Sequence, residues 1–217
     1  MSSYHRPPIE TPVFRDAEGR VIEYGNRWEG SPPTDAYSVD THPERFAPLH
    51  TVADALVAHL AETYDVRITE SADVATDLLR QSTPVVRALR IEPNDPRCAA
   101  ITLAYTDFPG IVMHAGLLHD FPFPVCGCDA CDSTGEYEVD ELERHVFAVV
   151  GGRYRESVHE GPAPWVGYSL EYPNGSTSGR SPAGEGLPAA QVEAARPILR
   201  VLSDGWAAWP RRAAVDS

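Results

Sequence analysis

The sequence predicts an α+β fold in which helices cover an antiparallel sheet. Short runs of branched and aromatic residues lie between residues 85 and 118, and turn residues rather than helices separate them. A further alternating run, Trp165–Tyr172, is followed by Pro173-Asn174-Gly175, which is a strong hairpin signal. Apolar residues at helical spacing come before, between and after these strands, a pattern typical of an α+β protein with an antiparallel sheet.

The first 40 residues predict an irregular N-terminal arm. They are rich in Pro, Gly and charged residues, and runs such as Arg6-Pro7-Pro8 and Gly30-Ser31-Pro32-Pro33 favour turns over helices. We therefore expect residues 1–40 to form an extended arm that docks in part on the core. Residues 41–209 are expected to form a single α+β domain, and residues 210–217 to fray.

A helix is predicted between about residues 48 and 64. Thr41-His42-Pro43-Glu44 has the spacing of a capping box, with Thr41 as the cap. Pro48 suits the first turn of this helix, where a missing N–H breaks no hydrogen bond. Apolar residues recur at steps of three and four and form one face, namely Leu49, Val52, Leu56, Leu60 and Tyr64.

Two smaller elements and a meander of three strands follow. Val66–Thr69 predicts a short strand, and Ala72–Gln81 predicts a weaker helix capped by Ser71. Short connections, including a type II turn at Pro109-Gly110, make the next strands antiparallel neighbours. These strands are Val85–Glu92, Ala99–Thr106 and Ile111–Leu118.

The remaining chain predicts two helices and the C-terminal hairpin. Val139–Val150 has inward apolar residues at helical spacing. Trp165–Tyr172 is expected to pair with a strand near Ser176–Arg180. A closing helix runs from Val192 towards Trp206 and is broken or restarted at Pro197.

Three of the four cysteines lie in the six residues Cys126–Cys131, in a C-x-C-x₂-C pattern. Three thiolates at this spacing can reach one soft or borderline metal ion. Gly127 lets the backbone turn tightly between the first two. Clustered cysteines in a reducing compartment are metal ligands more often than disulfides. We therefore expect Cys126, Cys128 and Cys131 to bind a structural zinc ion.

A tetrahedral zinc site needs a fourth ligand, and the predicted sheet offers two. If residues 99–107 and 111–119 form a hairpin around Pro109-Gly110, position 98 lies beside position 119. Cys98 and His119 would then lie at the end of the sheet from which the cysteine loop departs. Cys98 would complete a Cys₄ site, and His119 would complete a Cys₃His site.

Other chemistry at the cysteine loop stays open. Asp129 and Asp132 could ligate the ion or orient its ligands. An iron–sulfur cluster would also be satisfied by four cysteines. Cys128-Asp129-Ala130-Cys131 has the spacing of a redox pair, but the strands before it are predicted as a meander rather than a thioredoxin-like βαβ unit. Thiol-redox or metal-dependent catalysis is therefore an alternative, without assigned catalytic residues.

The net charge of the chain argues against two classes of binding partner. Lys and Arg total 18 against 32 Asp and Glu, a net charge of −14, which argues against nucleic acid and anionic membrane surfaces. An acidic module that binds or inhibits an unknown protein partner, with incidental cysteines, is the other alternative. No stretch approaches the roughly 20 apolar residues of a membrane span. Residues 1–9 lack a secretion signal, so we expect a cytoplasmic protein.

Two runs resemble a known family. Residues 123–132, FPVCGCDACD, resemble an uncharacterised actinobacterial family, a domain of unknown function, and residues 43–50, PERFAPLH, are similar too. The resemblance covers about residues 40–208, and the cysteine motif is its most specific part. It implies no assigned activity, so whether the protein is an enzyme stays open.

Overall fold

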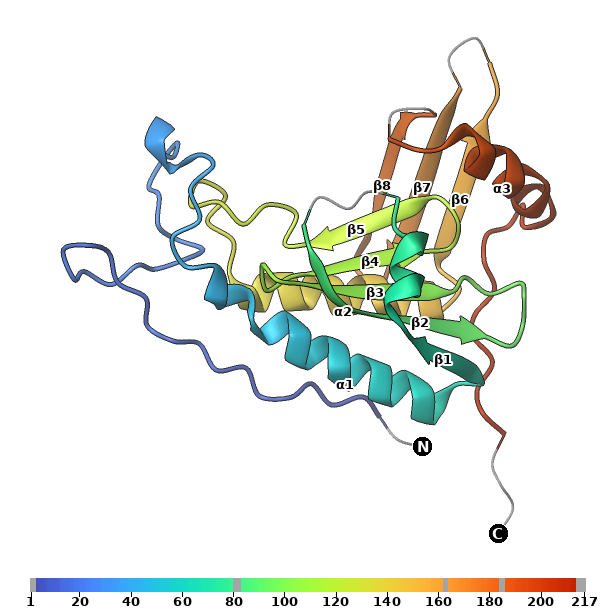
Figure 1. Ribbon diagram of the computed structural model, residues 1–217, viewed down its shortest axis with the longest axis horizontal. Helices are drawn as coiled ribbons and strands as arrows, with labels where there is room; N and C mark the ends of the chain where they lie inside the picture. The colour runs from blue at the N-terminus through green and yellow to red at the C-terminus, as the bar shows by residue number, and fades with distance from the viewer. Residues whose placement is uncertain (1–2, 80–82, 162–163, 184–185, 214–217) are drawn as a thin grey trace.

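The chain folds into two antiparallel sheets and three α-helices in the part described by the computed structural model, residues 3–79, 83–161, 164–183 and 186–213 (Figure 1). This confirms the predicted α+β class. The five-stranded sheet has the order β1-β2-β3-β4-β5, and the three-stranded sheet has the order β6-β7-β8. The strands are β1 Val66–Glu70, β2 Val85–Pro93, β3 Ile101–Thr106, β4 Ile111–Ala115, β5 His119–Phe123, β6 Tyr154–His159, β7 Trp165–Tyr172 and β8 Gly175–Pro182. The α-helices are α1 Pro48–Thr63, α2 Gly135–Val150 and α3 Ala189–Val201.

The predicted meander is present, but it is longer than expected. The third predicted strand stops at Ala115, because Gly116 adopts a φ of +67° and turns the chain. The chain then runs back as β5, in which His119 pairs with Ala115 and Phe123 pairs with Ile111. The cysteine loop therefore leaves the sheet at the end where β4 begins, opposite to the end that we expected.

One hydrophobic core lies between the five-stranded sheet and helices α1 and α2. Helix α1 presents the predicted apolar face to it, and α2 contacts both α1 and β7. On the other face of the sheet, the 3₁₀-helix Ala72–Asp77 covers Ala88 and Ala104. The inward side chains of β2 to β5 are fully or almost fully buried, namely Leu89, Ile91, Ile101, Leu103, Tyr105, Ile111, Met113 and Phe121.

Some helices differ from the prediction in where they begin or in their type. Helix α2 begins at Gly135 rather than Val139, because the Thr134 hydroxyl accepts a hydrogen bond from the backbone of Tyr137 at 3.1 Å. Ser71 caps its segment as predicted, but a 3₁₀-helix forms there in place of an α-helix. Residues 80–81 of that predicted helix lie outside the described residues.

The C-terminal half also departs from the expectation in two places. The hairpin of β7 and β8 is confirmed, but strand β6 beside it was not predicted. Helix α3 continues through Pro197 and ends at Val201, so Trp206 lies beyond it. Arg211 and Arg212 are bonded to the end of α1 and the following turn rather than frayed. None of the described helices is long and apolar enough to cross a membrane.

The turn at Gly116 yields a prediction for stability. A Cβ at Gly116 would overlap the Glu156 carboxylate and would also be held at a positive φ. We expect Gly116→Ala to lower the free energy of unfolding by about 2–4 kcal/mol, measured by urea denaturation. Gly19→Ala is the matched control, because Gly19 has a φ of +81° with open space around it. An equal loss in the two variants would mean that the close approach to Glu156 is unimportant.

Candidate metal centre

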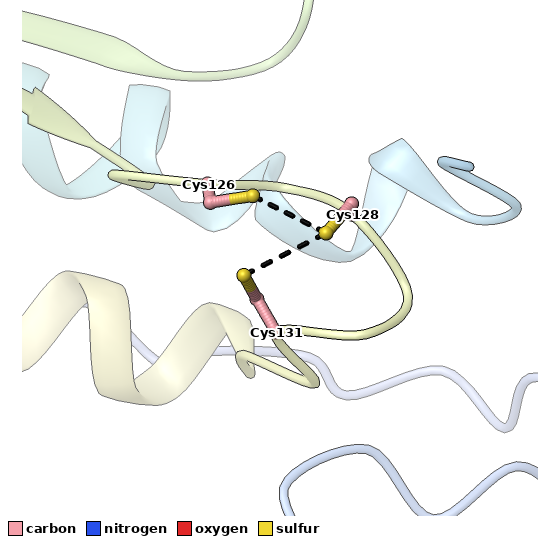
Figure 2. Close-up of side chains that lie close together, drawn as sticks. All are labelled: Cys126, Cys128 and Cys131. Atoms are coloured by element: carbon pink, nitrogen blue, oxygen red, sulfur yellow. Dashed lines mark hydrogen bonds between the residues drawn. The ribbon is translucent and has the colours of Figure 1, made fainter. Parts of the chain in front are cut away.

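The three clustered cysteines converge on one point in the loop between β5 and α2 (Figure 2). The Sγ atom of Cys128 lies 3.3 Å from that of Cys126 and 3.6 Å from that of Cys131. All three sulfur atoms lie within 4.8 Å of one another. Two thiolates bound to one tetrahedral zinc ion lie about 3.8 Å apart, as the Zn–S bond length of about 2.3 Å requires. The cluster can therefore hold one metal ion with only small movements.

The cysteines differ in their protonation. Burial raises the pKa of the Cys128 thiol, but hydrogen bonds from the Cys126 thiol and the backbone N–H groups of Cys131 and Ser38 outweigh burial and lower this pKa to about 7. Hydrogen bonding to Cys126, then burial and hydrogen bonding to Cys128, raises the pKa of Cys131 to about 12. Cys128 is buried whereas Cys126 and Cys131 are exposed. The Cys128 thiol therefore ionises more readily than that of Cys131, and a bound cation would displace the remaining protons.

The residue between the last two cysteines ties the loop to the N-terminal arm. The Asp129 carboxylate accepts hydrogen bonds from the Thr41 hydroxyl at 2.8 Å and the Thr41 backbone at 3.2 Å. It also forms an ion pair with Arg27 at 3.1 Å. The Asp129 backbone donates to the Val39 carbonyl, and its own carbonyl accepts from Trp28 Nε1. Because its carboxylate is committed to the arm, Asp129 is a poor candidate for a metal ligand.

These contacts correct the predicted role of Thr41. His42, and not Thr41, precedes the 3₁₀ turn Pro43–Phe46, and no side chain caps that turn. The Thr41 hydroxyl bonds to Asp129 instead, because the arm crosses the cysteine loop at this point. Burial raises the pKa of Asp129, but the hydrogen bonds from Thr41 and the ion pair with Arg27 outweigh burial and lower it below its usual range.

Asp132 is held in an unusual conformation beside the same contact. Its φ of +53° lies in the left-handed region, which is uncommon for a residue other than glycine. Its Oδ2 atom accepts from the backbone N–H of Arg27 at 2.8 Å. Its Oδ1 atom is buried and has no hydrogen-bond partner among the described residues. Asp132 therefore orients the loop against the arm, and it is not part of the group of close ligand atoms.

Arg45 is a residue that sequence reasoning missed. Its guanidinium is buried and donates to the carbonyl of Gly127, between the first two cysteines, at 2.7 Å and to that of Ser133, after the third, at 3.1 Å. It also lies 4.2 Å from the centre of the Tyr24 ring. A single arginine next to Phe46 carries no sequence signal for such a role, because its partners lie more than 80 residues away.

Cys98 and His119 do not lie at the cysteine loop. Strand β5 returns the chain to the far end of the sheet, so the two residues remain at the end where β4 stops. The Cys98 thiol is buried and donates to the Ala208 carbonyl at 3.3 Å, and His119 Nδ1 bonds to Glu156 at 2.9 Å. The expectation that either residue supplies the fourth ligand fails for this reason. Among the described residues, the group that could hold an ion consists of Cys126, Cys128 and Cys131.

Fold and site together define an α+β protein with a three-cysteine cluster that can hold a metal ion. The chain belongs to a family of unknown function, DUF6226, whose family model matches residues 10–213. The match extends over all the helices and strands and over the cysteine loop. No curated protein and no solved structure matches the chain.

The contact between the arm and the loop leads to a second prediction. Asp129→Asn removes the charge that Arg27 pairs with, so we expect it to weaken docking of the arm by about 2–3 kcal/mol. Because proteolysis follows local opening, cleavage within residues 24–41 should become roughly 30- to 150-fold faster. Asp40→Asn is the control, since Asp40 is exposed nearby. Equal cleavage of the two variants would contradict the assigned role of Asp129.

Proposed function

We propose that the protein binds one zinc ion through Cys126, Cys128 and Cys131, and that this ion stabilises the contact between the cysteine loop and the N-terminal arm. The observation that carries this proposal is the convergence of the three sulfur atoms within 4.8 Å of one another. Their spacings of 3.3 and 3.6 Å are close to those of thiolates around a tetrahedral ion. A reducing cytoplasm, which the sequence predicts, would keep these thiols available.

The ligand set favours zinc over an iron–sulfur cluster. Thiolates select soft or borderline ions such as zinc, and an iron–sulfur cluster is usually held by four cysteines. The fourth cysteine, Cys98, is buried at the opposite end of the sheet and bonded to Ala208. One chain therefore cannot assemble a four-cysteine cluster at this loop without refolding the sheet.

The role proposed for the ion is structural, because the arm docks directly on the chelating loop. Within the loop, Asp129 and Ala130 donate their backbone N–H groups to the arm carbonyls of Val39 and Ala36 at 2.7 and 3.0 Å. The Arg45 guanidinium joins Gly127 to Ser133, and the Cys131 backbone donates to the Cys128 carbonyl at 3.1 Å. An ion that links Cys126 to Cys131 would fix the shape of the surface that the arm contacts.

The ligand count also favours a second candidate function. Three protein ligands leave one tetrahedral position for water or substrate, which is the arrangement of catalytic zinc sites. Cys126 and Cys131 are exposed, so solvent can reach that position. A water molecule on zinc is a stronger acid than bulk water and can supply a nucleophile near neutral pH. This candidate is a metal-dependent hydrolytic site.

Metal content is the direct test of zinc binding. We expect elemental analysis to find about one zinc ion per chain in protein purified without added metal or a metal-binding tag. The variant Cys126→Ser/Cys128→Ser/Cys131→Ser should contain none. Cys98→Ala is the control and should keep its zinc, because Cys98 lies away from the loop. Native protein without metal, or a Cys98→Ala variant that loses it, would overturn the proposal.

Cobalt substitution tests the second candidate function. Co²⁺ replaces Zn²⁺ in tetrahedral thiolate sites and has visible d–d bands that report its ligands. We expect these bands to shift when imidazole or thiocyanate is added, because the fourth position is open to solvent. If neither added ligand changes the bands, the site is closed to solvent, and only the structural role of the ion is supported.

A further inference from the structure

Glu156 on β6 is a buried carboxylate surrounded by hydrogen-bond donors. It accepts from the backbone N–H groups of Leu117 at 3.0 Å and Leu118 at 2.8 Å, and from Trp206 Nε1 at 3.0 Å. His119 Nδ1 lies 2.9 Å from the same carboxylate. The first three groups can only donate, so Glu156 is arranged as an acceptor, and the proton of the fourth bond belongs to Nδ1. A neutral imidazole in this arrangement keeps its lone pair on Nε2.

The remaining nitrogen of His119 has no partner. His119 is 8% exposed, and its Nε2 atom is buried without a hydrogen-bond partner among the described residues. Only two other side-chain atoms of the described residues share this condition, and they belong to Arg27 and Asp132 in the arm contact. Buried polar atoms are nearly always bonded, so an oriented imidazole with an unused nitrogen points to a ligand.

The same imidazole lines a cavity of about 480 Å³. The cavity lies between β5, which is an edge strand, and the hairpin of β7 and β8. Leu118, Val166 and Leu187 supply apolar walls, and the Tyr168 ring lies 5.0 Å from the His119 ring. A volume of this size, apolar walls and a few polar groups are typical of small-molecule sites.

The charges at the cavity favour an anion. Arg180 lines it and lies 5.3 Å from the centre of the Trp165 ring, without an ion pair among the described residues. The acid at the cavity, Asp120, is already engaged, because its two oxygens accept from His114 Nδ1 and from the Leu79 backbone, each at 2.7 Å. The guanidinium is therefore the charged group that a ligand can neutralise.

We propose that this cavity binds a small organic anion with an apolar body and a hydroxyl or N–H group. The hydroxyl or N–H group donates to Nε2 of His119, and the anionic group pairs with Arg180. The apolar body lies against Leu118 and Val166. His119 lies at the opposite end of β5 from the cysteine loop, and none of the three clustered cysteines lines the cavity, so this site does not depend on the proposed zinc ion.

The test uses three probes that differ by one group each. 4-Hydroxyphenylacetate carries the hydroxyl, the ring and the carboxylate, phenylacetate lacks the hydroxyl, and 4-methylphenol lacks the carboxylate. Each is titrated to about 10 mM into the full-length protein labelled with ¹⁵N in histidine, and the ring nitrogens are followed by NMR. We expect a saturable shift of the His119 Nε2 signal with 4-hydroxyphenylacetate and weaker binding of the other two probes.

Variants then assign the two polar contacts. His119→Gln should weaken the binding of 4-hydroxyphenylacetate roughly tenfold, so that it binds no more tightly than phenylacetate. Arg180→Gln should weaken the binding of 4-hydroxyphenylacetate and phenylacetate several-fold and leave the binding of 4-methylphenol unchanged. Arg200→Gln is the control, since Arg200 is exposed and pairs with Glu160 outside this cavity.

Three outcomes would overturn the proposal. The first is the absence of any saturable shift at His119 in the wild-type protein with all three probes, which requires no variant to fold. The second is unchanged binding of both acids by Arg180→Gln, which alters only an exposed side chain. The third is a loss of binding in Arg200→Gln as large as that in Arg180→Gln, because the loss would then come from the change in net charge and not from a contact in the cavity.

Discussion

The bonds between the Gly116–Leu118 turn and Glu156 couple the two sheets. The turn ends β4 and begins β5, whereas Glu156 lies on the first strand of the smaller sheet. Burying an isolated carboxylate costs several kcal/mol, and that cost is offset here because four N–H groups surround the charge. Hydrogen bonds to a charged group contribute about 1.5–3 kcal/mol each. The turn, and with it the direction of β5, therefore depends on a residue some 40 positions further along the chain.

The direction of β5 then decides what each end of the larger sheet can do. Phe123 pairs with Ile111, so the chain leaves the sheet at that end and enters the cysteine loop. His119 pairs with Ala115 at the other end, beside Glu156 and the cavity. One strand of five residues thus separates the three-cysteine cluster from His119. A chain that ended its meander at β4 would have brought the two sets of residues together.

The sequence predicted most of the regular elements but not the one that positions the site. The apolar face of α1, the strands β2 to β4 and the hairpin after Tyr172 follow strong periodic patterns. Strand β5 has Pro122 within it and Pro124 after it, and proline is tolerated there because β5 is an edge strand. Strand β6 was missed because one of its two buried residues is Glu156, and glutamate is a residue type typical of the surface. The three clustered cysteines could be found because their spacing is local. The fourth-ligand prediction failed because it assumed that the meander ends at β4, whereas β5 follows it.

The contacts of the N-terminal arm could not be predicted from local sequence patterns either. Arg27, Arg45 and Asp129 are charged residues that become buried only when segments about 80–100 residues apart meet. Such an interface is polar, and each neutral hydrogen bond in it contributes about 1 kcal/mol. Binding of a structural zinc ion contributes of the order of 10 kcal/mol. An ion on the cysteines would therefore be strong enough to fix the shape of the loop that forms one side of this interface.

The three cysteines of the cluster lie within one loop, and this limits what a bound ion could stabilise. An ion bound by residues far apart in the sequence would close long loops of the unfolded chain and would stabilise the whole domain. Cys126 and Cys131 are only five positions apart, so binding orders a short loop and little else. The described core between the sheet and α1 and α2 does not include the three cysteines of the cluster. The domain is therefore expected to fold without metal, while the docking of the arm on Asp129 and Ala130 is the part of the structure that responds to it.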